Sequence, residues 1–546
     1  MAASDAMTSA PVDGFARSLL PRKDLWPVFD YSAEHLRNYP ERLNAAVALL
    51  DAAVASGNAD RVMLHYGAGA WTYGQLLDRV QRITRVLTEV VGVRRGESIL
   101  LRSWNSPMLA ACWLAVVRAG AIAVPTSPML REQELAFIVN KLRIRLALCE
   151  MSLGADLEAV LARSEWLRSV KHFTDWGDHR ADAELDALVS HEAPGGPSAD
   201  TAADDIATIV FTSGTTGAPK GAAHFHRDLL AACDCWRYPL PIERREPMCS
   251  TSSMAFTYGI TSNLLYPLRF RTSAVLLPKV TAELLVEAVE RHRVAALVTV
   301  PTVLRKLLPL LDSANTRSLA KCFSSAESLP RELWYAWRDA TGIRIIEGFG
   351  SSELLTRVLS PSADGEPVGS LGKAVPGYTA CLFDEEGKVV LSAGRGFLAI
   401  RGPTGCRYVG DEQMQKLFVR NGWNVLADVF EQDAAGYFWY LGRKDDVIVS
   451  SGYNISAVEV ERAIATHPSV LECAVVGVPD ANRGMIVRAC VVLHNPREAS
   501  EATARVLQEY VKSTIAPYKY PREVRFIEQL PKTLSGKVQR YKLRSI

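Results

Sequence analysis

The sequence predicts an α/β protein in which a large amino-terminal domain is followed by a small α+β domain. Three observations predict this fold class: repeated helix-then-strand pairs, a run of short strands and Gly-rich turns beyond about residue 370, and a return to alternating strands and helices after 442–446. At 546 residues the chain is also longer than one hydrophobic core supports, so two or more domains are expected.

The helix-then-strand pairs predict a parallel sheet. An apolar helix is expected at 107–118, and a short buried strand closed by proline follows at 120–125. A second helical pattern at 284–292 precedes a β-branched run at 295–300. Helices that cover both faces of a mostly parallel sheet are the usual product of this pattern, so we expect doubly wound α/β subdomains.

The β-rich region follows. Segments 387–390 and 396–401 are typical of short strands between Gly-rich turns, and helical patterns become scarce, which indicates a barrel-like subdomain.

The last region is expected to be a separate small α+β domain. It contains a strand at 447–450, a helix over 457–467 with apolar residues on one face, and a strand at 470–478. We place the domains at 1–443 and 444–546.

Charge and cysteine content narrow the function classes. Lys plus Arg total 62 against 60 for Asp plus Glu, without a block of like charge, so neither nucleic acid nor a membrane surface is an expected partner. The closest cysteines, Cys233 and Cys235, lack the cluster that zinc needs. Most of the ten cysteines are therefore expected to be buried thiols in a reducing compartment.

Neither a signal peptide nor a membrane span is expected. Asp5 and Asp13 lie where a signal peptide has a basic start and an apolar stretch. The most apolar segment, 109–124, is interrupted by Arg118 and Gly120, and it is shorter than the roughly 20 apolar residues that span a bilayer. We expect a cytoplasmic protein that is a monomer or a homodimer.

A glycine-rich loop carries the chemistry. The strand expected at 206–211 leads into Thr-Ser-Gly-Thr-Thr-Gly-Ala-Pro-Lys-Gly at 212–221. Phosphates bind where backbone N–H groups converge, and hydroxyls and a cation such as Lys220 add charge-assisted hydrogen bonds. The spacing of Gly214 and Gly217 does not match a Walker A loop, which excludes a P-loop kinase.

This ten-residue string resembles the phosphate loop of the adenylate-forming superfamily, which contains acyl-CoA synthetases, non-ribosomal adenylation domains and firefly luciferase. Further motifs follow in the superfamily's order: Gly-Phe-Gly-Ser-Ser-Glu at 348–353, Asp428, Gly-Arg-Lys-Asp-Asp at 442–446, and Pro-Lys-Thr-Leu-Ser-Gly-Lys at 531–537. The resemblance spans nearly the whole chain.

The resemblance implies ATP and Mg²⁺, with Glu353 holding the metal and Asp428 and Arg443 contacting the ribose. The catalytic residues that it implies are Lys537, Glu353, Thr216 and Lys220. The remaining residues implied to bind ATP or coenzyme A are Thr212, Ser213, Gly214, Thr215, Gly217, Gly221, Ala326, Glu327, Gly348, Phe349, Ser352, Asp428, Arg443, Gly452 and Tyr453.

The resemblance also implies a moving domain. Lys537 would lie between the carboxylate and the α-phosphate of ATP, where a cation lowers the barrier to attack. Asp445 would be the hinge about which the small domain turns. The loop containing Gly452 would then face the acceptor thiol.

Coenzyme A is the expected acceptor, since the sequence shows no carrier-protein module after Lys537. Segments 224–228, 402–408 and 450–455 resemble the aryl-CoA ligases, above all 2-aminobenzoate (anthranilate)–CoA ligase and then benzoate–CoA ligase. An aryl acid needs a flat apolar slot. The residues implied to line it are Ala255, Phe256, Thr257, Tyr258, Gly259, Ser325, Gly350 and Thr356, with Ala326 beside them.

Two departures from the family pattern and two alternatives remain. Ala427 replaces a glycine before Asp428, and it would be strained and weaken ATP binding if that position has a positive φ. Thr356 stands where benzoate ligases carry a histidine, so their substrate preference does not transfer. The alternatives are an enzyme that loads a separate carrier protein and an inactive ligand-binding relative.

Overall fold

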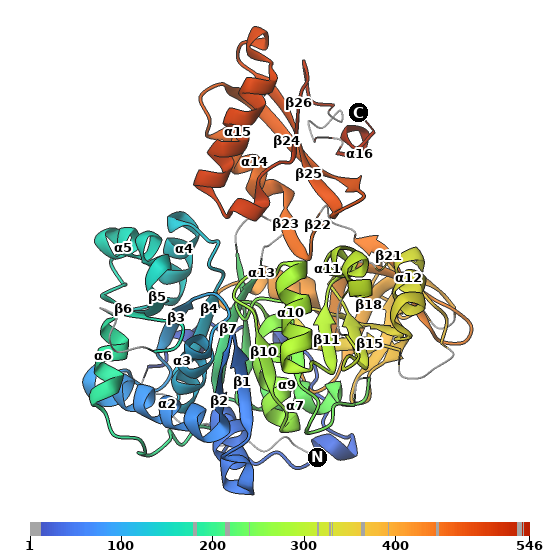
Figure 1. The fold of residues 1–546 in the computed structure, drawn as a ribbon. Helices are drawn as coiled ribbons and strands as arrows, with labels where there is room; N and C mark the ends of the chain where they lie inside the picture. The colour runs from blue at the N-terminus through green and yellow to red at the C-terminus, as the bar shows by residue number, and fades with distance from the viewer. Residues whose placement is uncertain are drawn as a thin grey trace.

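A large body carries a smaller carboxyl-terminal unit in the computed structural model (Figure 1). The structure describes residues 13–177, 183–212, 219–239, 241–313, 316–326, 329, 331–361, 366–390, 393–443, 447–531, 538 and 540–545. The carboxyl-terminal unit, from β22 onward, stands on one end of the body, and the β22–β23 hairpin lies at the junction (Figure 1).

The first sheet has six strands in the order β6-β5-β3-β4-β7-β8, parallel except for β8. Its strands are β3 (Ser98–Arg102), β4 (Ile122–Thr126), β5 (Leu146–Glu150), β6 (Ser169–Phe173), β7 (Ile206–Thr212) and β8 (Lys220–Phe225). Its flanking helices are α2 (Tyr73–Arg85), α3 (Pro107–Arg118), α4 (Glu132–Leu142), α5 (Gly154–Arg163) and α6 (Glu184–His191).

The second sheet has seven strands in the order β13-β12-β11-β9-β10-β1-β2, parallel except for β2. Its strands are β1 (Val62–Tyr66), β2 (Gly69–Thr72), β9 (Met248–Ser250), β10 (Ala274–Leu276), β11 (Ala296–Thr299), β12 (Lys321–Ser324) and β13 (Ile345–Glu347). The associated helices are α7 (His226–Trp236), α8 (Thr257–Ile260), α9 (Tyr266–Phe270), α10 (Ala282–His292), α11 (Pro301–Leu307) and α12 (Arg331–Thr341).

The two sheets share one core, which gives five layers. Helices α2, α3, α7 and α9 contribute to a single apolar cluster that contacts strands of both sheets. Helices α4 and α5 cover the outer face of the first sheet, and α10 to α12 cover that of the second. The doubly wound α/β prediction is confirmed. The expected helix at 107–118 is α3, in which Ser106 caps the first turn and Pro107 occupies the first helical position.

The expected β-rich region consists of antiparallel strands. A three-stranded sheet contains β14 (Phe349–Gly350), β15 (Arg357–Ser360) and β16 (Lys373–Ala374). A five-stranded sheet contains β17 (Thr379–Phe383), β18 (Gly394–Arg401), β19 (Val419–Arg420), β20 (Trp423–Gln432) and β21 (Phe438–Arg443). Helix α1 (Phe15–Ser18) precedes the sheets, and α13 (Glu412–Phe418) precedes β19. The strand expected at 387–390 was wrong, because only an isolated bridge between Val389 and Phe383 forms there.

The carboxyl-terminal unit is α+β, as expected. It contains β22 (Val447–Ser450), β23 (Tyr453–Ser456), α14 (Ala457–Ala465), β24 (Val470–Asp480), β25 (Gly484–Leu493), α15 (Glu501–Thr514), β26 (Glu523–Phe526) and α16 (Arg540–Leu543). Apolar side chains of α14 and α15 pack on the sheet to form a core of their own. In the described part of the chain, every helix is too short or too polar to cross a bilayer.

Candidate active site

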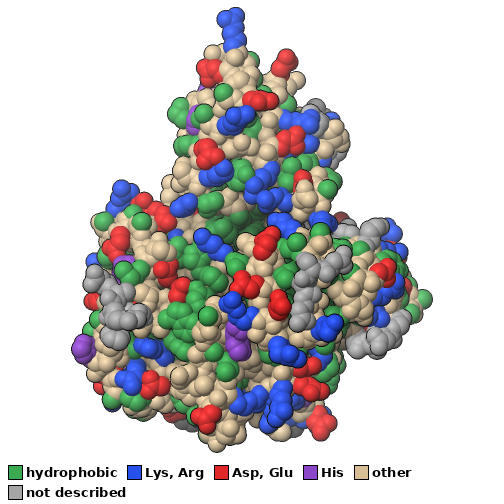
Figure 2. All heavy atoms as spheres, in the orientation of Figure 1, with side chains coloured by type: hydrophobic (Ala, Val, Ile, Leu, Met, Phe, Trp, Pro, Cys, Tyr) green, Lys and Arg blue, Asp and Glu red, His purple; other side chains and the backbone are tan. Residues whose placement is uncertain are grey.

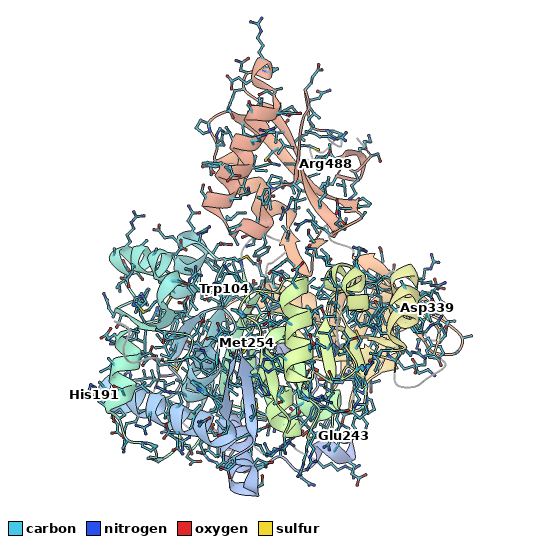
Figure 3. All side chains as sticks on the ribbon, in the orientation of Figure 1. Trp104, His191, Glu243, Met254, Asp339 and Arg488 are labelled. Atoms are coloured by element: carbon cyan, nitrogen blue, oxygen red, sulfur yellow. The ribbon has the colours of Figure 1, made fainter. Side chains whose placement is uncertain are left out.

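The predicted site residues follow the carboxyl ends of neighbouring strands. The loop after β3 is tied to the loop after β9, because Met254 N–H donates to Asn105 Oδ1 at 2.8 Å and Asn105 Nδ2 donates to Ser252 O at 3.0 Å. Trp104 and Met254 of these two loops lie near the middle of the body in Figure 3. Ligands of open α/β sheets bind at this edge, so the strand order explains why motifs far apart in sequence converge.

The phosphate loop connects two antiparallel strands. Thr212 at the end of β7 pairs with Lys220 at the start of β8. A side chain on the next residue, Gly221, would place its Cβ 2.8 Å from Val409, so only glycine fits this close packing. Lys220 is buried, and its Nζ lies 6.0 Å from the centre of the Tyr408 ring.

Tyr408 connects this lysine to the predicted metal ligand. Its hydroxyl donates to Glu353 Oε1 at 2.6 Å, and Glu353 is only half-buried. The arrangement puts a cation near one aromatic ring and a half-buried carboxylate at the hydroxyl of the same ring. A hard divalent cation prefers one or two carboxylates plus phosphate oxygens, so Glu353 next to a phosphate loop fits Mg²⁺.

The buried side chains of Arg407, Asp228 and His224 together carry no net charge. Arg407 donates to Asp228 at 2.7 Å, and both side chains are fully buried. Burial lowers the pKa of His224 to about 4, so this histidine is neutral at pH 7. Segments 224–228 and 402–408 therefore contact each other through the Arg407–Asp228 ion pair, next to strand β8.

The predicted ribose carboxylate lies on β20. Asp428 is buried, Tyr440 donates to its Oδ1 at 3.5 Å, and its cross-strand partner is Arg443. Phe349 packs against the Tyr440 ring at 6.1 Å between ring centres, which brings the Gly348–Phe349 motif beside Asp428.

Ala427 is not strained. It lies inside β20 and is absent from the residues with positive φ. The expectation of weakened ATP binding at this position therefore loses its physical cause.

Two further residues of the predicted site follow β12. Ser325 Oγ donates to Gly348 O at 2.5 Å, which joins the ends of β12 and β13. Ala326 has a φ of 71° and is exposed. Such a conformation is uncommon for a residue with a side chain, and strained residues of this kind cluster at functional sites.

The segment 255–259, which we call the aryl segment, contacts the nucleotide motifs. Thr257 Oγ1 donates to Ser352 Oγ at 3.3 Å, and Tyr258 OH donates to Thr299 O at 2.9 Å. A Cβ at Gly259 would come 1.8 Å from Ser253 O, so glycine is required at this position inside α8.

Thr356 and Gly350 adjoin Arg357, which contacts the aryl segment through Tyr258. Thr356 is buried, with its hydroxyl 2.8 Å from Tyr266 OH. A Cβ at Gly350 would lie 2.2 Å from Thr356 O, so β14 and β15 can approach only through glycine.

The β22–β23 turn reaches the aryl segment from the carboxyl-terminal unit. Ser451 and Gly452 both have positive φ, at 50° and 82°, as a two-residue hairpin turn requires. The next residue, Tyr453, stacks on Tyr518 at 4.2 Å and meets the Phe256 ring edge-on at 6.4 Å. Gly452 and Tyr453 thus lie where the two units meet.

Comparison with protein families identifies the architecture. The model described as AMP-binding enzyme matches residues 51–407, and the AMP-binding enzyme C-terminal domain matches 459–537. The chain belongs to the AMP-binding enzyme family. Benzoate–CoA ligase of Thauera aromatica is 31% identical over 512 residues, which cover 93% of this chain and 96% of that protein.

Two solved structures resemble this AMP-binding enzyme over nearly its whole length. One is the anthranilate CoA ligase AuaEII in complex with anthranoyl-AMP, with 29% identity, a TM-score of 0.72, and 93% of this chain and 98% of that chain covered. The other is a benzoate CoA ligase from Burkholderia xenovorans LB400, with 28% identity, a TM-score of 0.68, and coverage of 92% and 100%. The chain is therefore an acid–thiol ligase of the acyl- and aryl-CoA synthetase branch.

Several predicted residues of this AMP-binding enzyme lie outside the described residues. They are Ser213, Gly214, Thr215, Thr216, Gly217, Glu327, Asp445 and Lys537, together with the side chain of Arg443. Leu530 and Val538, on either side of the Lys537 motif, pack with the carboxyl-terminal sheet. The roles of all these residues stay predictions.

Sequence reasoning missed two residues that the structure brings to this site. Tyr408 belongs to segment 402–408, which resembles the aryl-CoA ligases, but nothing in the sequence indicated that its hydroxyl would reach Glu353. Arg357 donates to Tyr258 OH at 2.8 Å from inside the protein. An arginine four residues after Glu353 gives no sequence signal of burial, since arginine is mostly exposed.

Proposed function

We propose that the protein is an ATP-dependent aryl-acid–CoA ligase that acts in two half-reactions. An aryl carboxylate oxygen attacks the α-phosphate of ATP, and pyrophosphate leaves. The thiolate of coenzyme A then attacks the acyl carbon of the aryl-AMP, and AMP leaves. The observation that carries the proposal is the position of the aryl segment, which contacts the nucleotide motif through Ser352 and the carboxyl-terminal turn through Tyr453.

The nucleotide half of the site supports ATP. Thr212, Lys220 and Gly221 frame the loop that would receive the phosphates, and the buried Asp428 carboxylate would accept hydrogen bonds from the ribose hydroxyls. Glu353 would hold Mg²⁺, which would neutralise phosphate charge when bound. Tyr408 orients the Glu353 carboxylate through one oxygen.

A change of geometry separates the two half-reactions in this proposal. The geometry of the structure suits thioester formation, because the Gly452 turn faces the aryl segment. For adenylation the domain 444–546 would turn about Asp445 and bring Lys537 to the α-phosphate. The cation is needed only in the first step, in which the negatively charged carboxylate approaches the negatively charged α-phosphate.

The acid is a benzoate in this proposal. Tyr258 and Phe256 supply aromatic surface of the kind that packs against a flat ring. Figure 2 shows hydrophobic side chains gathered in a hollow of the surface beneath the carboxyl-terminal unit. Together with the similarity to anthranilate and benzoate ligases, these features make 2-aminobenzoate and related benzoates the first acids to assay.

Isotope exchange tests the first half-reaction. Labelled pyrophosphate should enter ATP only when an aryl acid is present, and the absence of exchange with every benzoate tried would leave an inactive binding protein as the better account. Mass spectrometry then identifies the acceptor. Aryl-CoA formed from free coenzyme A is expected, whereas acylation of only a phosphopantetheinyl protein would indicate a carrier-loading enzyme.

The Lys537→Ala variant tests the proposed alternation. It should abolish pyrophosphate exchange while leaving thioester formation from pre-made aryl-AMP largely intact. Equal loss of both half-reactions would contradict a role confined to adenylation.

A further inference from the structure

Arg357 is a buried arginine whose side chain runs under the aryl segment. It begins β15, pairs with Gly350 across β14, and is 4% exposed. A Cβ on Gly348 would lie 2.6 Å from Arg357 Cδ, so the glycine motif leaves the channel that this side chain occupies. The guanidinium lies 3.1 Å from the centre of the Phe323 ring and 4.9 Å from that of Tyr258.

The guanidinium is incompletely satisfied. Nη2 donates to Tyr258 OH at 2.8 Å, but Nε and Nη1 have no hydrogen-bond partner among the described residues. Arg357 also forms no ion pair with a carboxylate in the described part of the chain. Burial accordingly lowers the pKa of this guanidinium.

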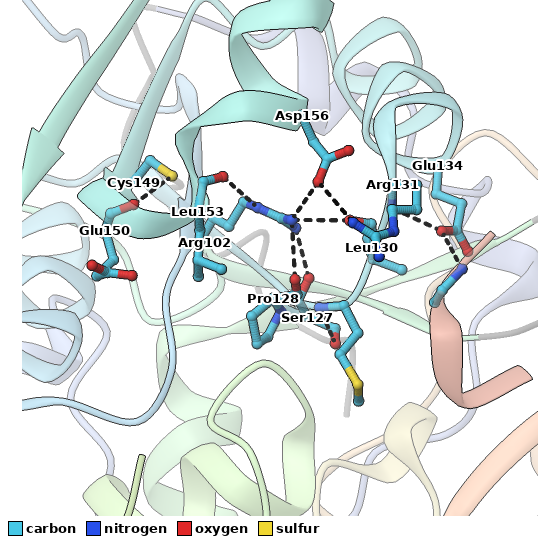
Figure 4. A network of polar contacts seen from close by, with 12 residues as sticks. Arg102, Ser127, Pro128, Leu130, Arg131, Glu134, Cys149, Glu150, Leu153 and Asp156 are labelled. Atoms are coloured by element: carbon cyan, nitrogen blue, oxygen red, sulfur yellow. Dashed lines mark hydrogen bonds and ion pairs between the residues drawn. The ribbon is translucent and has the colours of Figure 1, made fainter. Parts of the chain in front are cut away.

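Other buried arginines of the protein are compensated. Arg407 has the Asp228 carboxylate at 2.7 Å. Arg102 has Asp156 at 3.2 Å and donates to the carbonyls of Ser127, Pro128 and Leu130 at 2.9 to 3.0 Å (Figure 4). A buried cation without a counter-charge is costly, and the aromatic rings around Arg357 offset only part of that cost.

Tyr258 connects the unpartnered N–H groups of Arg357 to the proposed substrate site. Tyr258 is only half-buried and belongs to the aryl segment, while its hydroxyl spans Thr299 O and Arg357 Nη2. An arginine that served only to hold β15 would be expected to donate to carbonyls, as Arg102 does. Arg357 instead keeps two buried N–H groups, Nε and Nη1, without a partner among the described residues, next to Tyr258 of the aryl segment.

We propose that Arg357 is a specificity residue that binds an anionic substituent on the ring of the aryl acid, a second carboxylate or a phenolate. This inference rests on the proposed function and narrows its substrate. Such an oxygen accepts from the unused N–H groups and supplies the missing charge. The amino group of 2-aminobenzoate supplies no negative charge, and unsubstituted benzoate has no group to offer. Both are poorer substrates on this account.

The test compares acids in the wild type and in two variants. Benzoate, 2-aminobenzoate, and the 2-, 3- and 4-isomers of hydroxybenzoate and benzenedicarboxylate are assayed by pyrophosphate exchange and, independently, by calorimetric binding. At least one anionic substituent should raise kcat/KM and affinity over benzoate by about tenfold or more. Arg357→Met should remove that preference, and Arg357→Lys should restore part of it.

A matched variant separates recognition from folding. Tyr258→Phe deletes the hydroxyl but keeps the ring and the cation, so the preference for an anionic substituent should survive in it. If benzoate is turned over and bound as well as every substituted acid, or if Arg357→Met lowers affinity for all acids equally, Arg357 is not a specificity residue. If no acid supports exchange, the proposed function fails, while the binding preference still decides the role of Arg357.

Discussion

Replacing Lys519 with methionine should uncouple the second half-reaction from the first. Lys519 joins the two units: its Nζ donates to Glu134 Oε1 on α4 and to Glu459 Oε1 on α14, both at 2.6 Å. The three side chains are 4%, 7% and 11% exposed respectively. Ala516 N–H also donates to Glu134 Oε2 at 3.1 Å. Figure 4 shows Glu134 facing the carboxyl-terminal segment.

The size of the effect of Lys519→Met on docking follows from the two carboxylates, Glu134 and Glu459, that remain without a cation. Without the ammonium, two buried carboxylates lose their shared cation, and breaking a buried pair in this way costs about 3–5 kcal/mol. That energy corresponds to roughly two to three and a half orders of magnitude in the docking equilibrium of the carboxyl-terminal unit. The body side cannot relax easily, because Arg102 fixes the loop that leads into α4.

The assay measures each half-reaction by itself. In Lys519→Met, aryl-CoA formation from pre-made aryl-AMP should fall at least about tenfold, while acid-dependent pyrophosphate exchange should change little. Adding Glu459→Gln removes one uncompensated charge and should recover part of the loss, as a double-mutant cycle would measure. Lys512→Met, on a half-buried lysine that pairs with Glu509 of its own helix, is the control. Equal effects on both half-reactions, or none on either, would show that the contact of Lys519 with Glu134 and Glu459 does not stabilise the docked geometry specifically.

Three further predictions concern the same site. Burial raises the pKa of Glu459 to about 7, although the attraction of Lys519 opposes this shift. Protonation of Glu459 therefore favours docking of the carboxyl-terminal unit on the body. This contribution is complete below the ordinary pKa of 4.5 and is lost as the pH rises through 7. The ratio of the rate of thioester formation to the rate of pyrophosphate exchange should therefore fall between pH 5.5 and 8. Glu459→Gln should make this ratio nearly independent of pH. A ratio that rises with pH would contradict the predicted direction. Tyr408→Phe removes a hydrogen bond to the Glu353 carboxylate and should raise the KM for MgATP by about tenfold or more. Tyr238→Phe, on an exposed tyrosine, is the control. An unchanged KM would show that the hydrogen bond from Tyr408 to Glu353 does not contribute to binding MgATP. Gly452→Val, at a φ of 82°, should slow thioester formation and spare exchange, and a loss of exchange alone would be inconsistent with the turn's proposed position.

The sequence predicted the elements that depend on local pattern. Helix α3 and strands β7 and β22 lie where periodicity and turn residues placed them, because their apolar faces and boundaries are encoded by neighbours in the chain. The expected strand at 387–390 failed, since four residues carry too little pattern to distinguish a bridge from a strand.

Contacts between distant residues could not be predicted in the same way. The pairing of Tyr408 with Glu353 and of Lys519 with Glu134 joins residues 55 and 385 positions apart. The motif order supplied the identity of the nucleotide residues, but only the fold shows that Arg357 is buried and that none of the residues the structure describes supplies its counter-charge. The concern about Ala427 was likewise settled by its backbone, which is that of an ordinary strand.

The central claim is that one protein joins an aryl acid to coenzyme A through an adenylate. The most direct measurement follows all products of a single reaction containing ATP, Mg²⁺, coenzyme A and a benzoate. We predict that aryl-CoA, AMP and pyrophosphate appear in equal amounts. Release of ADP and phosphate, or no thioester with any aryl acid, would contradict the account.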